Sequence, residues 1–183
     1  MSGTERLVTA EEFARIPEDD LDRYELVEGR LVRMSPPNFD HGRIVGQVVY
    51  LLKTHLKTQP TGVAVIETGF TIASNPDTVR GPDVAFVRQD RIPSPGTCGF
   101  PKIAPDAVFE VLSPDDRPGE IRKKIAEYIR RGVHLVVVIN PDDKTVVIHR
   151  PGPQLVTLRD GHDVLDMADV IPGFTCRVSD IFE

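Results

Sequence analysis

Residues 105–116 read PDAVFEVLSPDD, and the apolar run inside them predicts a strand buried in the middle of a sheet. One residue conflicts with that environment, because Glu110 lies within the run Ala107–Leu112. An ionised carboxylate in an apolar interior costs several kcal/mol unless it is paired, protonated or bound to a metal. Two explanations are therefore open: Glu110 is a metal ligand, or it forms a structural ion pair with Lys124 or an arginine.

The segments around this strand predict a mixed α/β sandwich with helices against one mixed sheet. Two amphipathic helices are expected, over residues 40–57 and 118–131, because their apolar residues recur at helical spacing. A short helix is expected to begin at Thr9, which forms a capping-box pattern with Glu12. Strands are expected over YELVEGRLVRMS, with a tight turn at Glu28-Gly29, and over residues 62–73, 82–87, 134–140 and 144–150, with a β-rich tail.

The chain of 183 residues predicts one domain over residues 1–183, and its 40% hydrophobic content suffices for a core. The first residues predict no signal peptide, and no apolar run is long enough to suggest a membrane span. Cys98 and Cys176 share no metal-type spacing, which favours two reduced thiols in a cytoplasmic protein over one disulfide. The net charge of −6 counts mildly against a constitutive nucleic-acid binder, but a carboxylate site would itself add negative charge.

Asp83, Glu110 and Lys124 are the residues whose types suit metal-assisted phosphodiester hydrolysis. Mg²⁺ takes one or two carboxylates together with water and phosphate oxygens, and a lysine supplies a fixed positive charge. At ~100° per residue, Lys124 falls on the flank of the apolar face of its helix, whereas Lys123 faces solvent. Asp106 also follows a proline, but four residues place it ~13 Å from Glu110 along the strand, so Asp83 is the better partner.

Each of these residues also has a structural explanation. Asp83 could only begin a strand, and Lys124 could be a solvated side chain on an amphipathic helix. His41 could contact phosphate or cap the helix that follows it. The basic residues Arg117, Arg122, Lys123, Arg130 and Arg131 could meet a phosphate backbone, although such a surface is usually only solvated. Residues 88–104, rich in proline and glycine, predict a long loop that serves as a specificity element or a dimer contact.

Five stretches, in this order, resemble the Uma-type restriction endonuclease family: YELVEGRLV, PDVAFV, PDAVFEVLSP, KIAEYIRRGV and VVVINP. That family belongs to the PD-(D/E)XK phosphodiesterase superfamily, and the likeness runs from about Thr9 to Phe182. The resemblance implies a restriction-endonuclease-like fold, an endonuclease that uses Mg²⁺ or Mn²⁺ to hydrolyse DNA, and a homodimer.

The resemblance also assigns site residues. Asp83 matches the motif aspartate, Glu110 the motif glutamate and Lys124 the motif lysine, while Glu25 in YELVEG is a further ligand or an orienting group. The lysine departs from the superfamily pattern, because the position two residues after Glu110 is Leu112. A second hypothesis therefore stands beside the enzyme: a catalytically inactive member of the fold that acts as a nucleic-acid-binding or regulatory module.

Overall fold

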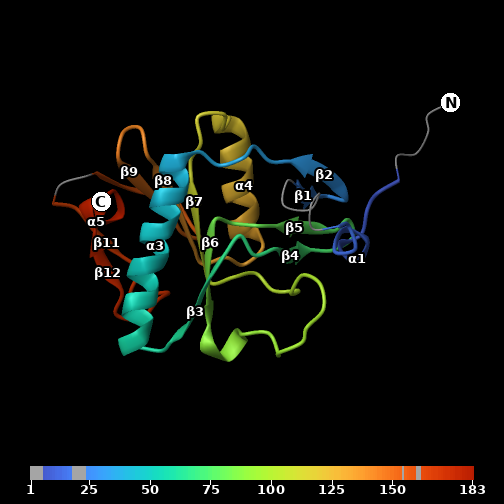
Figure 1. Cartoon of the computed structure of the whole chain (residues 1–183), viewed down its shortest axis with the longest axis horizontal. Coiled ribbons are helices and arrows are strands. Elements are labelled where there is room, and N and C mark those ends of the chain that lie inside the picture. Colours follow the sequence, from blue (N-terminus) through green and yellow to red (C-terminus); the bar gives the residue numbers. More distant parts are fainter. Residues whose placement is uncertain (1–5, 18–23, 154, 160–161) are drawn as a thin grey trace. The chain divides into compact units, whose positions relative to one another are not determined.

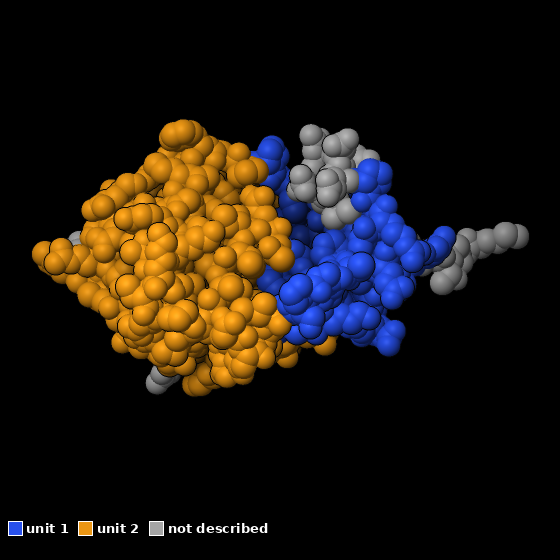
Figure 2. Space-filling view, turned by 60° about the horizontal axis from the view of Figure 1, so that its bottom comes forward, with its two compact units in different colours: residues 1–36, 69–81, 93–104 blue, residues 37–68, 82–92, 105–183 orange. Residues whose placement is uncertain are grey.

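The computed structural model describes residues 6–17, 24–153, 155–159 and 162–183. Within them the chain forms two compact units, coloured separately in Figure 2. The smaller unit comprises residues 1–36, 69–81 and 93–104, and the larger unit comprises residues 37–68, 82–92 and 105–183. The chain passes between the units several times, so neither is a continuous segment. The single domain over residues 1–183 stays a prediction.

The larger unit is built on a six-stranded mixed sheet (Figure 1). In sheet order its strands are β10 (Leu155–Arg159), β9 (Thr145–His149), β8 (Leu135–Asn140), β7 (Ala107–Val111), β6 (Val84–Arg88) and β3 (Gly62–Ile66). Strands β7 and β8 are parallel, and the other neighbouring pairs are antiparallel. The apolar strands β7 and β8 lie in the interior of the sheet, as their sequences predict.

Helices α3 (Phe39–Thr58) and α4 (Pro118–Arg130) pack on this sheet. Helix α3 contacts β3, β6 and β7, and its apolar stripe joins one hydrophobic core with Phe109 and Val111. Because side chains alternate along a strand, Glu110 points to the other face, where residues of α4 meet it. The observed bounds agree with the helices expected over residues 40–57 and 118–131. The mixed central sheet flanked by helices is confirmed.

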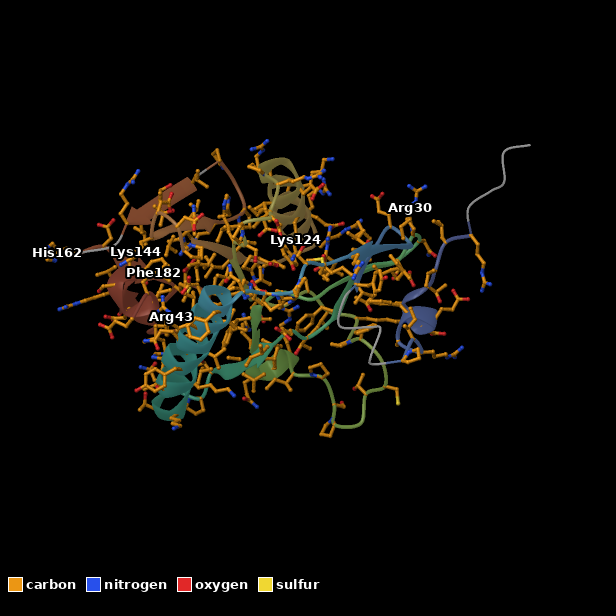
Figure 3. The ribbon with its side chains drawn as sticks, turned by 45° about the horizontal axis from the view of Figure 1, so that its top comes forward. Arg30, Arg43, Lys124, Lys144, His162 and Phe182 are labelled. Atoms are coloured by element: carbon orange, nitrogen blue, oxygen red, sulfur yellow. The ribbon has the colours of Figure 1, made fainter. Side chains whose placement is uncertain are left out.

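The end of the chain packs against α3. Strands β11 (Val164–Asp166) and β12 (Thr175–Arg177) form a small ribbon, and α5 (Val178–Ile181) follows it. The Arg43 guanidinium of α3 donates to the backbone carbonyls of Phe182 and Glu183, and Gln47 donates to the carbonyl of Asp180. Arg43 and Phe182 are labelled in Figure 3. These side chains satisfy carbonyls at the end of α5 that have no partner within the helix.

The smaller unit contains a four-stranded sheet in the order β2 (Arg30–Arg33), β1 (Tyr24–Val27), β5 (Thr78–Arg80) and β4 (Phe70–Ala73). Strands β1 and β2 form the expected hairpin, in which Glu28 and Gly29 both have positive φ. That backbone favours glycine and matches the twist of a tight hairpin. Helix α1 (Ala10–Phe13) begins with the Thr9–Glu12 capping box, which confirms that prediction.

Some expectations need correction. The sequence predicts one sheet, whereas the described residues form three. Residues 62–73 read as one stretch of strand, but β3 belongs to the six-stranded sheet and β4 to the four-stranded sheet. Residues 67–69 lie between the two strands, and Glu67 has a positive φ. Strand β5, only three residues long, was not expected because its sequence, TVR, is too short to show periodicity. The loop after β6 contains only a short 3₁₀ turn, η1 (Gln89–Arg91).

Among the described helices, none combines the length and the apolar character needed to cross a bilayer. Both cysteines are free thiols in the structure. Cys98 is exposed, whereas Cys176 on β12 is partly buried beside the main core. Burial, together with the nearby Asp180, raises the pKa of the Cys176 thiol to about 12.

This difference predicts the reactivity of the two thiols. Because the thiolate is the nucleophile, Cys98 should react with a disulfide reagent at pH ~8 while Cys176 should not. We expect one fast thiol per folded chain and a second only after denaturation, measured by absorbance with Ellman's reagent. In Cys98→Ser the fast phase should disappear. Rapid labelling of two thiols in the folded protein would contradict this assignment.

Candidate active site

Glu110 is buried, and both of its carboxylate oxygens accept hydrogen bonds from α4. Lys124 Nζ donates to Oε2 at 2.9 Å, and the Tyr128 hydroxyl donates to Oε1 at 2.8 Å. Lys124 and Tyr128 are one helical turn apart, so both reach the same strand residue. Lys124, labelled in Figure 3, is buried as expected, whereas Lys123 is exposed. The buried carboxylate is therefore satisfied by one cation and one hydroxyl.

Asp83 lies directly before β6, at the end of the sheet where β7 finishes. Its Oδ2 accepts a hydrogen bond of 2.7 Å from the backbone amide of Val111, the residue after Glu110. The antiparallel register pairs Val84 with Phe109, and one further step along it places Asp83 beside Glu110. The structure thus brings three predicted residues, Asp83, Glu110 and Lys124, to one end of β6 and β7. The Asp83 side chain is 19% exposed, so solvent reaches it.

His41 joins this group from α3. Its Nε2 lies 3.2 Å from Asp83 Oδ2 and its side chain is buried. The hydrogen bond with Asp83 raises the pKa of His41, and burial opposes that shift. The carboxylates of Glu110 and Glu67 also raise this pKa. Asn38, rather than His41, caps the helix through the His41 amide.

Two residues of this site were not expected to belong to it. Glu67 follows β3, and its amide donates to the Asp83 carbonyl at 3.2 Å, so it extends the row formed by Asp83 and Glu110. Tyr128 follows the apolar spacing of α4, so the sequence pattern gives no signal for its hydrogen bond to Glu110. The sequence did carry a signal for His41, because it lies on the apolar face of α3 in phase with Val48 and Leu52.

Glu25, the further predicted ligand, lies in the smaller unit on β1. Its Oε2 accepts from Arg80 Nη1 at 2.7 Å, and its Oε1 accepts from the backbone amide of Gly81 at 3.1 Å. These partners explain why this hairpin glutamate is buried rather than solvent-facing. Its role as a ligand or orienting group stays a prediction.

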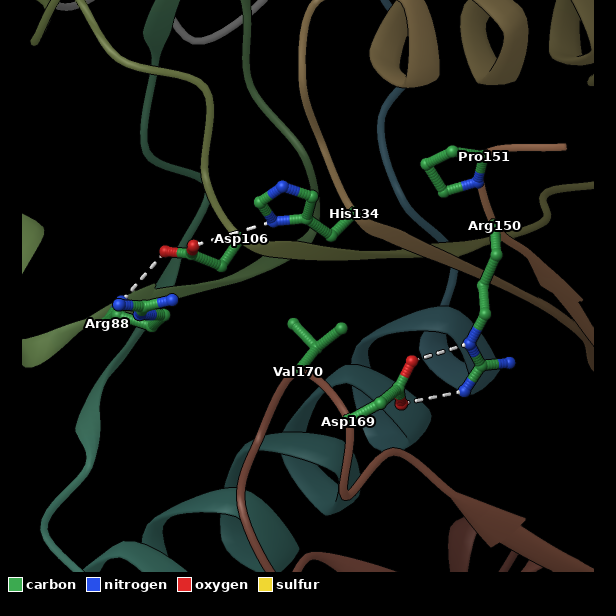
Figure 4. Close-up of a pocket in the computed structure, with 7 residues that line it drawn as sticks. All are labelled: Arg88, Asp106, His134, Arg150, Pro151, Asp169 and Val170. Atoms are coloured by element: carbon green, nitrogen blue, oxygen red, sulfur yellow. Dashed lines mark hydrogen bonds and ion pairs between the residues drawn. The ribbon is translucent and has the colours of Figure 1, made fainter.

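A polar pocket of about 400 Å³ lies at the other end of β6 and β7, away from Asp83 and Glu110 (Figure 4). Asp106, fully buried, accepts from the Arg88 amide at 2.9 Å and from Arg91 Nη1 at 2.6 Å. Asp169 is held by two hydrogen bonds from Arg150. Asp106 thus anchors the start of the long loop after β6. Both carboxylates of this pocket, Asp106 and Asp169, form ion pairs with arginines. We therefore interpret the pocket as a structural network of ion pairs.

The donor set of the candidate site suits a hard cation. Within the described residues, no group of three or more His, Cys, Asp and Glu side chains is arranged to hold a metal ion. Mg²⁺ is nevertheless commonly held by one or two carboxylates, with water and substrate phosphate completing its coordination. Asp83 and Glu110 are the pair that would hold it. Val111 and His41 both contact Asp83 through Oδ2.

The fold and this acidic site, with its buried lysine, define a protein of the restriction-endonuclease-like class. The family model of Uma2, described as "Putative restriction endonuclease", matches residues 10–179. The chain belongs to this family. A similar solved structure is described as "a putative nuclease belonging to DUF820" from Anabaena variabilis. It is 25% identical, with a TM-score of 0.83, over 96% of this chain and 97% of that chain. A comparison with curated proteins finds no match.

The ion pair between His41 and Asp83 predicts a pH dependence of stability in the metal-free protein. Because the folded pKa of His41 is raised, its contribution is complete below the unfolded pKa of ~6.5 and is lost as pH rises through the folded value. We expect His41→Asn to lower the free energy of unfolding relative to the wild type at pH ~5.5, and to lower it less at pH ~8.5. Urea denaturation in EDTA measures both differences. The exposed His162 supplies the control His162→Asn. An equal loss at both pH values would contradict the ion pair.

The buried pair of Glu110 and Lys124 predicts strong coupling. Lys124→Met should destabilise the protein by about 3–5 kcal/mol, because it leaves a buried carboxylate without its cation. Adding Glu110→Gln removes that charge, so the double variant should be more stable than Lys124→Met alone. Urea denaturation measures both free energies of unfolding. The matched control Lys123→Met, on the exposed side of α4, should change stability by less than ~0.5 kcal/mol. If the change in free energy of unfolding of the double variant equalled the sum of the changes of the two single variants, the two side chains would not interact.

Proposed function

We propose that the chain is a metal-dependent endonuclease that hydrolyses phosphodiester bonds in DNA. The observation that carries this proposal is the approach of Asp83 to Glu110, fixed by the 2.7 Å bond from the Val111 amide. Two carboxylates from adjacent strands and a buried lysine form a compact set of the types that phosphodiester hydrolysis needs. Membership of a nuclease family supports the same reaction.

The roles follow from position. Asp83 and Glu110 would hold Mg²⁺ or Mn²⁺, which when bound acts as a Lewis acid toward the phosphate and lowers the pKa of water. Lys124 holds Glu110 in place and would supply positive charge that offsets the negative charge developing in the reaction. His41 fixes the orientation of Asp83 from the opposite helix. Tyr128 orients Glu110 through its second oxygen.

A second candidate function is supported by the closed contacts of Glu110. Both of its oxygens are engaged by Lys124 and Tyr128, and all three side chains are buried. The same arrangement would serve a catalytically inactive module in which the ion pair only supports the fold. Leu112 at the usual lysine position favours this alternative. Metal binding separates the two functions, because only the enzyme requires it.

The cellular setting and assembly belong to the same proposal. Two free thiols suit a reducing compartment, so we place the protein in the cytoplasm. A homodimer would supply two sites that could act on the two strands of a duplex. Sedimentation equilibrium of the purified protein would measure its assembly directly.

Two measurements test the proposed nuclease activity. Calorimetric titration measures Mn²⁺ binding, and a plasmid assay measures cleavage. We expect the wild type to bind Mn²⁺ and to nick plasmid DNA. Asp83→Asn and Glu110→Gln should lose binding and reduce cleavage by more than ~100-fold, since changes behind the ligands already cost about 10–100-fold. Glu110→Gln is preferred to alanine because its carbonyl oxygen can still accept from Lys124 while its NH2 group donates to the Tyr128 hydroxyl.

The control Asp115→Asn, an exposed carboxylate outside the site, should leave both measurements unchanged. Cleavage that survives in both site variants would contradict the assignment of Asp83 and Glu110 as the catalytic carboxylates. A wild type that neither binds Mn²⁺ nor cleaves any nucleic acid would favour the inactive module.

A further inference from the structure

One face of α3 points away from the sheet and carries an unusual set of side chains. Six exposed residues follow each other at intervals of four and three, so they lie on one side of the helix. We call this the outer strip: Phe39, Arg43, Gly46, Tyr50, Lys53 and Lys57. It lies opposite the apolar stripe that packs on the sheet.

Two large aromatic rings in the outer strip are left in water. Phe39 is 84% exposed and Tyr50 is 62% exposed. Eleven residues separate them, which is about 16 Å along the helix axis. Between them, Gly46 of the strip and its neighbour Gly42 have open space where a side chain would begin. The rings therefore project from a surface that no neighbouring side chain covers there.

The outer strip is basic although the whole chain has a net charge of −6. Helix α3 holds three residues with permanent positive charge, Arg43, Lys53 and Lys57, and a single acidic residue, Asp40. Arg43 donates to backbone carbonyls at the end of the chain and lies 3.9 Å from Asp40 Oδ1, so Lys53 and Lys57 supply the uncompensated charge of the strip. Of the two lysines, neither forms an ion pair with any described residue. Exposed aromatic rings interleaved with cations are the arrangement by which proteins bind unpaired nucleotides.

The first turn of α3 carries both the start of the outer strip and a residue of the candidate site. Phe39 is two residues before His41, whose ring contacts Asp83. A polymer lying along the strip would therefore have one end at the helix turn that carries His41. The cations favour a polyanion over a second copy of the same strip, which would bring lysines toward one another.

We propose that the outer strip of α3 binds a single-stranded polynucleotide and leads it to the site. This inference rests on the proposed function, because the site to which the polynucleotide is led is the proposed nuclease site. The rings of Phe39 and Tyr50 stack on bases, and Lys53 and Lys57 neutralise phosphates. Bases in a duplex already stack on each other, so rings on a helix surface select nucleotides that are unpaired.

Fluorescence anisotropy with labelled oligodeoxythymidylate in EDTA tests binding without cleavage. Phe39→Ala and Tyr50→Ala should each weaken binding by about 10-fold, in keeping with the stacking of one base on each ring. Tyr50→Phe keeps the ring and should retain most of the affinity. Lys53→Ala and Lys57→Ala should each reduce the slope of log affinity against log salt by roughly 0.7. Leu155→Ala, at a 58% exposed apolar residue far along the chain, is the matched control.

Parallel arms identify the ligand. A duplex of the same length should bind more weakly and should not respond to Phe39→Ala, while oligouridylate shows whether RNA uses the strip as well as DNA. Affinity for the single strand that is unchanged in Phe39→Ala and Tyr50→Ala would overturn the proposal. Sedimentation that shows a wild-type dimer turning into a monomer in these variants would also overturn it, because a second copy then covers the strip.

The binding experiment distinguishes failure of the outer-strip proposal from failure of the proposed nuclease function. Ring-dependent binding without any cleavage would support the strip while contradicting the nuclease. Metal-dependent cleavage by a protein whose strand binding ignores the rings would support the nuclease while contradicting the strip.

Discussion

The structure of the larger unit depends on one carboxylate inside an apolar strand. Lys124 and Tyr128 stabilise Glu110 there by donating hydrogen bonds to its two oxygens. Those partners are four residues apart on α4, so the rotation of that helix about its axis is fixed by the strand residue it must serve. Strand β7, helix α4 and strand β8 form a parallel crossover unit, which brings the helix back over the strand that precedes it.

The same end of the sheet gathers the other charges of the unit. Asp83 is tied to β7 by the Val111 amide, and Glu67 is tied to Asp83 by its own amide, so backbone hydrogen bonds continue past the regular strands. Three carboxylates in a row repel one another unless cations lie nearby. His41 and Lys124 supply that compensation from helices α3 and α4. A bound divalent cation would compensate the same charge, which is why the geometry suits a metal although the protein's own cations already balance it in part.

Much of the larger unit could be predicted from sequence, because its elements have clear periodicity. The buried strand around Glu110 and the amphipathic helix behind Lys124 carry their own signals, and helical phase alone distinguished Lys124 from Lys123. The contact between His41 and Asp83 could not be predicted, since it joins residues 42 positions apart through a sheet register that periodicity does not encode. The second sheet is not predictable for a related reason: β3 and β4 are consecutive and both apolar, and the three residues between them carry no strong turn signal. The burial of Glu25 could not be predicted either. It depends on hydrogen bonds from Arg80 and Gly81, which the sequence pattern does not connect to Glu25.

The ion-pair and metal-ligand explanations of Glu110 use the same atoms, so they do not exclude each other. A lysine that neutralises a buried carboxylate also makes that carboxylate a weaker attractor for a second cation, and affinity for the metal then depends on Asp83 and on the substrate phosphate. A site of this kind would bind metal best when nucleic acid is present. The basic outer strip of α3 allows an acidic chain to attract such a polyanion locally. Acidic residues more than ~8–10 Å from the strip are largely screened at physiological salt, so they repel the polyanion little. Net charge alone therefore says little about whether this fold engages nucleic acid, and the distribution of charge around α3 says more.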